Sequence, residues 1–226
     1  MSELLRWVEN DLQLLALSFL DLAYLLRIIW LLRYPASRDR QAPSGSRAKG
    51  VLYSWANIAM PWAMESTRQN FFWYLQFVMF HVGIAAAIAL SFVIPYAPHL
   101  LDRLFLVRGW QALMGTAGVV GGYRLYRRFA DPVLRRISTP DDFFSLLLLT
   151  IWLLVAVAAA PNRPEQGEGL LLTFFFMTAF FLFYVPFSKI LHYLYYPFTR
   201  YYFGKSMGHR GVYPLRRGPQ PGSVKT

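Results

Sequence analysis

Long apolar runs separated by short charged segments dominate the sequence. A helix that crosses a membrane takes about 20 mostly apolar residues, and five runs approach or exceed that length. We expect these spans at residues 12–32, 70–94, 109–126, 143–160 and 173–200. The pattern therefore predicts an all-α membrane protein, built as one bundle of five transmembrane helices.

Two segments outside these spans have a character of their own. Residues 51–66 are apolar but short and contain Pro61, so we expect an interfacial or re-entrant segment beside the membrane. Residues 204–226 are basic and rich in glycine and proline, which indicates a cytoplasmic tail that is extended or becomes ordered on a partner. We therefore expect one transmembrane domain over residues 1–203, followed by this tail, and no separate soluble domain.

Small residues and a helix-start signal refine two of the spans. Gly118 and Gly122 in the third span have the spacing of a helix-packing face, although a groove for a haem edge or a quinone would need the same small residues. Thr139, followed by Pro140 and two aspartates, is typical of a helix N-terminus. We therefore expect the fourth helix to begin there.

The distribution of charge predicts the orientation of the helices. The chain has 23 Lys and Arg against 12 Asp and Glu, a net charge of +11. Six of the basic residues lie between residues 33 and 68, five between 124 and 136, and seven from residue 189 onward, whereas the other side holds four. Because cytoplasmic loops are rich in Lys and Arg, we expect an outside N-terminus and a cytoplasmic C-terminus in a bacterial inner membrane. The charge thus reports topology, and no nucleic-acid partner is expected.

The chain contains no cysteine. This excludes an iron–sulphur cluster held by this chain, a covalently attached c-type haem and a disulfide within the chain. Any redox centre here must be held by histidine or methionine, and any further electron carriers must belong to partner subunits.

Two histidines lie inside apolar runs, His81 in the second span and His192 in the fifth. Polar groups at such positions are costly, so they are functional candidates. His81 is about 12 Å along the helix from Trp73, a predicted anchor at the inner interface, and His192 is roughly 5–15 Å from the tyrosine-rich inner rim of the fifth span. The two imidazoles can therefore lie at one level in the inner half of the membrane.

Spacing alone leaves several explanations for this pair open. The imidazoles can hold a haem iron from both sides, make structural hydrogen bonds, or relay protons or ions. Asp21, in the middle of the first span, can bond an aromatic side chain of a neighbouring helix or handle protons near a quinone site. The sequence has no inverted repeat or paired broken helices of the kind that transporters contain.

Two short motifs resemble the gamma-subunit family of respiratory nitrate reductase, which are membrane cytochromes b. Residues 186–192 (PFSKILH), with the aromatic residues that follow, resemble the end of that family's last helix, and residues 80–84 (FHVGI) resemble its second-helix haem motif. The number of spans, their orientation and the basic cytoplasmic tail agree with the family. The resemblance implies that His81 and His192 are the axial ligands of the haem nearer the cytoplasm.

The family's second haem has no counterpart ligands in this chain. Its histidines would fall near Ser91 and Phe174, neither of which ligates iron. The resemblance therefore implies a single haem b, and it puts in doubt the outward quinol site that the family builds around its second haem. One-haem relatives occur in the redox complexes of sulphate reducers, and the chain is most similar in size to the membrane subunit of the high-molecular-weight cytochrome c complex.

The resemblance implies transmembrane electron transfer through one bis-histidine haem b. Electrons would pass between a cytoplasmic iron–sulphur protein docked on the basic loops and menaquinone, other integral membrane subunits, or through them a periplasmic multihaem cytochrome c. Lys189, Arg27 and Arg200 are candidates for contacts with the haem propionates. The rival interpretation is a non-redox anchor that holds partner subunits at the membrane.

Overall fold

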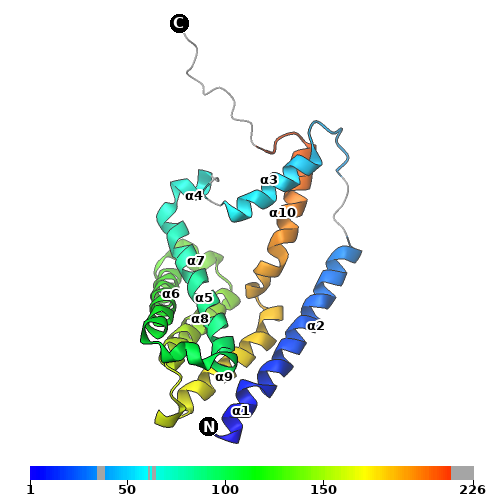
Figure 1. Cartoon of the computed structure of the whole chain (residues 1–226). Helices are drawn as coiled ribbons and strands as arrows, with labels where there is room; N and C mark the ends of the chain where they lie inside the picture. Colours follow the sequence, from blue (N-terminus) through cyan, green and yellow to red (C-terminus); the bar gives the residue numbers. More distant parts are fainter. Residues whose placement is uncertain (35–38, 61, 63–64, 215–226) are drawn as a thin grey trace. The chain divides into compact units, whose positions relative to one another are not determined.

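The computed structural model describes residues 1–34, 39–60, 62 and 65–214. Within these residues every regular element is a helix (Figure 1), which confirms the predicted all-α class. The chain divides into two compact units, each described below by itself: Met1–Arg27 with Phe72–Leu191, and Ile28–Phe71 with His192–Thr226.

Four of the described helical segments are long and apolar enough to cross a membrane: Glu3–Arg33, Phe71–Tyr96, Pro140–Ala159 and Gly169–Phe187. They overlap the first, second, fourth and fifth predicted spans, which supports a helical membrane protein. The third predicted span, residues 109–126, lies within helix α6 (Leu104–Ala130), which is long enough but is not among these four. Its glycines and arginines lower its hydropathy.

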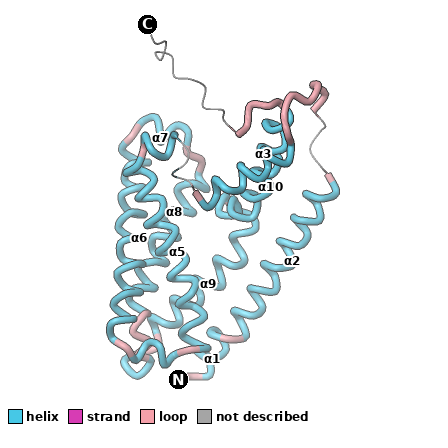
Figure 2. Tube along the Cα trace, turned by 45° about the horizontal axis from the view of Figure 1, so that its top comes forward, coloured by secondary structure: helices cyan, strands magenta, loops and turns pink. Residues whose placement is uncertain are grey.

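In the first unit, α5 (Phe71–Tyr96), α6 and α8 (Pro140–Ala159) lie side by side (Figure 2). Gly121 of α6 faces Thr150 of α8 and Phe80 of α5, and a Cβ at this position would meet both. Gly118 lies against Leu154, whereas a Cβ at Gly122 would meet nothing within 4 Å. The predicted packing face is therefore confirmed at Gly118, but its second member is Gly121 and not Gly122.

Helix α9 (Gly169–Tyr184) contributes much of the core of this unit. Phe174 and Phe175 are fully buried, and Phe174 stacks on Trp152 of α8 with 6.0 Å between ring centroids. The indole Nε1 of Trp152 donates to Thr178 Oγ1 at 3.0 Å, so this buried polar group is satisfied. The short helix α1 (Glu3–Glu9) packs on α9 and buries Leu5.

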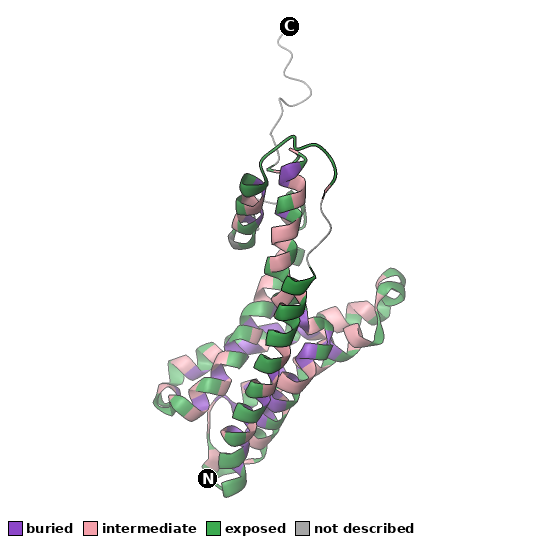
Figure 3. Ribbon diagram, turned by 90° about the vertical axis from the view of Figure 1, so that its right-hand side faces the viewer, coloured by how far each residue is buried: buried purple, intermediate pink, exposed green. Residues whose placement is uncertain are grey.

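Helix α2 (Asp11–Arg33) follows α1 and leaves much of its apolar surface exposed; the helix that rises from the N-terminus in Figure 3 is mostly green. Within the first unit it contacts α9 through a Gln13 Nε2 to Phe175 carbonyl bond of 2.8 Å and through the rings of Phe19 and Phe183. Five of its leucines within this unit, by contrast, are more than half exposed: Leu14, Leu15, Leu22, Leu25 and Leu26. An apolar face of this kind suits lipid or another membrane subunit.

The last predicted span, residues 173–200, is not one helix. After α9 ends at Tyr184, the short 3-10 helices η4 (Val185–Phe187) and η5 (Lys189–Leu191) separate it from α10 (His192–His209). Pro186 has no N–H to donate, and Ser188 adopts extended backbone with φ −109° and ψ 170°. The prediction of a continuous helix is therefore wrong, and His192 begins a new helix.

In the second unit, α3 (Arg47–Ala59) packs along α10, and α4 (Glu65–Gln69) follows α3. Gly50 lies so close to α10 that a Cβ would meet the carbonyl of Gly204 and the Cα of Gly208. Much of the predicted interfacial segment, residues 51–66, thus belongs to a helix paired with the chain's own α10, although Pro61 lies outside the described residues.

The predicted extended tail, residues 204–226, is also partly wrong. Its first six residues are the C-terminal turns of α10, which ends at His209. Residues 215–226 lie outside the described part of the chain.

Candidate functional site

His81 lies on α5, on a different face from the one that packs against α6. Its Nδ1 is 2.7 Å from the carbonyl oxygen of Phe77, one turn earlier, and the two rings are 4.0 Å apart. A carbonyl can only accept, so Nδ1 carries the proton and donates it. The lone pair of this imidazole is therefore on Nε2, the nitrogen that a metal would bind.

His192 is the first residue of α10, directly after the break that follows α9. Its side chain is exposed, and its ring lies edge-on to Tyr193 with 6.4 Å between centroids. His81 belongs to the first unit and His192 to the second, so the pairing of the two imidazoles stays a prediction.

Lys189 is held by the first turn of α8. Its Nζ is 2.7 Å from Asp142 Oδ2, and its backbone N–H donates to Asp141 Oδ2 at 2.9 Å. Asp142 also accepts from the backbone N–H of Thr139 at 2.7 Å. This bond caps the N-terminus of α8, which begins where the sequence predicts. The ammonium of Lys189 therefore already has an anionic neighbour within the protein.

Asp141 is the centre of a polar network whose members lie far apart in the sequence. Oδ1 accepts from the hydroxyl of Tyr184, at the end of α9, and from Ser145 Oγ at 3.1 Å, while Oδ2 accepts from Lys189. One carboxylate thus joins α8 to both sides of the break after α9. The sequence signal at Thr139–Asp142 indicates the start of a helix, but it does not reveal these distant partners.

Two charged residues of α2 have different surroundings. Nη2 of Arg27 reaches the carbonyl of Pro186 at 3.5 Å, which is long for a hydrogen bond. Asp21 is exposed on the same helix. Arg27 is therefore brought to the break after α9, whereas Asp21 is not buried as the hydrogen-bonded alternative would require.

Arg200 binds within the second unit. Its Nε and Nη2 both donate to the carbonyl of Ser54 at 3.1 Å, and Ser54 Oγ returns a bond of 2.7 Å to the carbonyl of Arg200. The guanidinium therefore ties α10 to α3.

His209, which the sequence places in the tail, is a buried residue of the same helix pair. Arg47 Nε donates to its Nδ1 at 3.1 Å, so the ring proton is on Nε2, which donates to the carbonyl of Gln41 at 2.8 Å. Both ring nitrogens are engaged, and this imidazole is structural. His99, in the short helix Pro98–Asp102, is exposed.

The two positions that would carry ligands for a second haem are filled in other ways. Phe174 is fully buried against Trp152, and Ser91 bonds the carbonyl of Ile88 at 2.7 Å.

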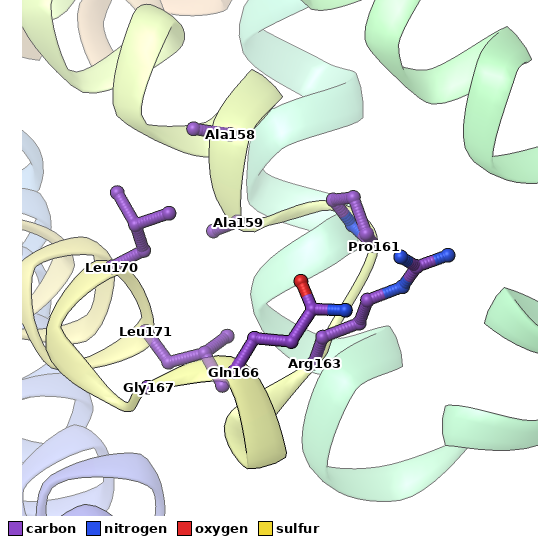
Figure 4. A pocket seen from close by; sticks show the side chains of 8 residues that line it. All are labelled: Ala158, Ala159, Pro161, Arg163, Gln166, Gly167, Leu170 and Leu171. Atoms are coloured by element: carbon purple, nitrogen blue, oxygen red, sulfur yellow. The ribbon is translucent and has the colours of Figure 1, made fainter.

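A cavity of about 220 Å³ lies at the turn between α8 and α9 (Figure 4). Arg163 and Gln166 line it together with mostly apolar residues: Ala158, Ala159, Pro161, Gly167, Leu170 and Leu171. Next to it in sequence, Glu168 accepts bonds from the Ser2 side chain and backbone, which hold the pKa of Glu168 below its usual value. The cavity contains none of the site residues predicted from the sequence.

Comparison with known proteins identifies no relative of this chain. The chain matches no protein-family model, and a search of curated proteins finds no similar sequence.

Proposed function

We propose that this chain is a membrane cytochrome b subunit that holds one haem b between His81 and His192, like the nitrate reductase gamma-subunit family that its motifs resemble. The observation that carries the proposal is the bond from His81 Nδ1 to the Phe77 carbonyl, on a helix long and apolar enough to span a membrane. A bond of this kind orients the ring and leaves the lone pair on Nε2, as in metal-binding histidines generally.

The face of α5 around His81 suits a flat apolar group. Phe77 and Ala85 lie one turn before and one turn after His81, and all three are exposed. Ala85 is small, and Phe77 offers an aromatic surface. The opposite face has no such room, because a Cβ at Gly83 would already meet Ala117. The donor chemistry and the shape of this face therefore both fit haem.

When bound, a haem with two histidine ligands accepts and donates single electrons and has no open coordination position. In this proposal His81 and His192 hold it. Lys189 already pairs with Asp142, and Arg200 with Ser54. Arg27 has only a long contact, so we propose it as the main cation near the propionates. Exposed Asp21 is the residue that we propose to exchange protons with menaquinone.

The proposed setting is a respiratory complex in a bacterial inner membrane. We propose that α6 also crosses the membrane, which gives five transmembrane helices in all, with the N-terminus outside and the C-terminus in the cytoplasm. Electrons would pass between the haem and a cytoplasmic iron–sulphur subunit docked on the basic loops. On the other side, the partner would be menaquinone, another integral membrane subunit or a periplasmic multihaem cytochrome c.

A reduced-minus-oxidised absorption spectrum of the purified chain tests the proposal. We expect a b-type band from one haem per chain. His81→Ala and His192→Ala should each lose this band because each removes an axial ligand. His99→Ala is the matched control, since it removes an exposed histidine and should keep the full band.

Two results would contradict this proposal at different levels. A wild-type protein without any b-type band would leave the non-redox anchor as the better interpretation. A full band in either histidine variant would show that the assigned coordination is wrong even if haem is present.

A further inference from the structure

Five arginines gather at one end of the first unit, where α6 ends and the short helix α7 (Pro132–Ile137) follows. Three lie in the last turns of α6, at Arg124, Arg127 and Arg128, and two lie on α7, at Arg135 and Arg136. The guanidinium of Arg127 sits 4.0 Å from the ring centroid of Trp73, near the start of α5. The start of one candidate membrane span and the end of α6 therefore meet at this corner.

Little negative charge compensates these arginines. Asp131 lies between the two helices, but its Oδ1 caps α7 by accepting from Val133 and Leu134, and its Oδ2 is 3.9 Å from Arg127. Arg128 donates to the neutral hydroxyl of Ser138. The carboxylates at the nearby start of α8 serve Lys189 and Tyr184. Even with Asp131 counted, the corner therefore keeps an excess of positive charge.

The same corner exposes apolar side chains between its cations. Val133 and Ile137, one turn apart on α7, are 66% and 70% exposed, and Tyr126 and Phe129 at the end of α6 are also more than half exposed. Arg135 and Arg136 lie between Val133 and Ile137 in sequence and are exposed as well. A ligand that satisfies this surface must carry both negative charge and hydrocarbon.

We propose that this corner binds an anionic phospholipid, with the headgroup phosphate on Arg135 and Arg136 and an acyl chain along Val133 and Ile137. Guanidinium groups form paired hydrogen bonds with phosphate oxygens, and basic clusters at the ends of membrane helices recognise anionic headgroups. An acidic protein surface would match the charges but would leave the exposed apolar side chains uncovered, so the proposed iron–sulphur subunit would dock on the other basic segments, residues 33–68 and those from residue 189 onward. This inference requires a membrane protein and does not depend on haem.

Native mass spectrometry of the purified full chain, with equal amounts of phosphatidylglycerol and phosphatidylcholine added in detergent, tests the proposal. We expect the wild-type protein to retain phosphatidylglycerol preferentially. Arg135→Gln with Arg136→Gln should reduce that preference on the order of tenfold, because each basic residue near anionic lipid contributes separately. The Lys/Lys double variant at these positions should keep part of it.

The matched control removes two exposed arginines from the opposite end of α6, Arg103→Gln with Arg108→Gln, and should keep the preference. An equal loss in this control would show that net charge alone attracts the lipid and would overturn the assignment. Equal retention of both lipids by the wild-type protein would overturn it without any variant. The proposal would also be overturned if the wild-type protein showed no lipid preference and if Arg135→Gln with Arg136→Gln instead abolished binding of an acidic partner protein.

Discussion

The surroundings of each histidine decide what its ring can do. His209 has both nitrogens bonded within the protein and is buried, so its imidazole holds the structure together. His81 has its Nδ1 proton directed to a carbonyl of its own helix, which fixes the tautomer with its lone pair on Nε2. The sequence can identify histidines in apolar segments as candidate ligands. Only the contacts of each ring in the structure distinguish a structural imidazole from a candidate ligand.

His209→Ala should loosen the pairing of α3 with α10. It removes both hydrogen bonds of the buried ring, to Arg47 and to the Gln41 carbonyl, and each such bond contributes about 0.5–1.5 kcal/mol to the free energy of unfolding. Hydrogen–deuterium exchange of α3 and α10 amides should therefore quicken. His99→Ala, which changes an exposed ring, should leave these exchange rates unchanged. Equal exchange rates in the two variants would show that His209 does not stabilise the pairing of α3 with α10.

The break after α9 is built by side chains as much as by its proline. Proline prevents a normal helix from continuing, but it does not determine where the chain goes next. Asp141 binds Tyr184 before the break and the backbone N–H of Lys189 after it, so the start of α8 fixes both sides of the interruption. Lys189 lies three residues before His192, the first residue of α10.

Asp141→Ala should release this junction. The Lys189 N–H loses its acceptor, so its exchange with deuterium should speed up by about tenfold or more, the equivalent of one lost hydrogen bond. Asp102→Ala, at an exposed carboxylate in the helix Pro98–Asp102, is the control and should have no effect on that amide. Unchanged exchange in Asp141→Ala would mean that Pro186 and Ser188 suffice to hold the break.

Glycine allows α3 and α10 to approach closely. Gly50→Ala would drive a Cβ into the Gly204 carbonyl and the Gly208 Cα, and backbone cannot move aside as a flexible side chain can. We expect a loss of about 1–3 kcal/mol, seen as a lower thermal midpoint. Gly122→Ala meets nothing within 4 Å and should be neutral or stabilising by up to about 1 kcal/mol, since alanine favours helix. Similar midpoints for the two variants would refute the close contact.

Some of these elements could be predicted from the sequence and others could not. Hydropathy finds the apolar helices, and the Thr139 signal finds the start of α8, because both depend on neighbouring residues. The pairing of Gly50 with Gly204 and of Asp141 with Lys189 joins positions far apart in sequence, and nothing local reveals it. The apolar run through Pro186 predicts one continuous helix, but the structure has a break there between α9 and α10. The two-histidine site stays a prediction, whereas the continuous helix in which His192 was placed is wrong.

The number of membrane crossings depends on α6, whose composition alone is ambiguous. Gln111 Nε2 donates to the Val157 carbonyl at 3.1 Å, and further along Gly121 faces Thr150, so α6 runs antiparallel to α8 over several turns. Its 27 residues extend about 40 Å, more than the hydrocarbon core of a bilayer. A helix of this length can cross the membrane if its glycines and polar groups pack against the neighbouring α8 and so do not face lipid.

Labelling of single cysteines can decide between four crossings and five, because the wild-type chain has no cysteine and provides an unlabelled background. Asp102→Cys and Pro140→Cys lie before and after α6 at exposed positions. If α6 crosses, an impermeant maleimide should label Asp102→Cys in intact cells and Pro140→Cys only after the membrane is opened. Glu165→Cys, beyond α8, should behave like Asp102→Cys. Labelling of Asp102→Cys and Pro140→Cys from one side would place α6 against the membrane without crossing it, and the reverse sidedness would invert the orientation that the basic loops predict.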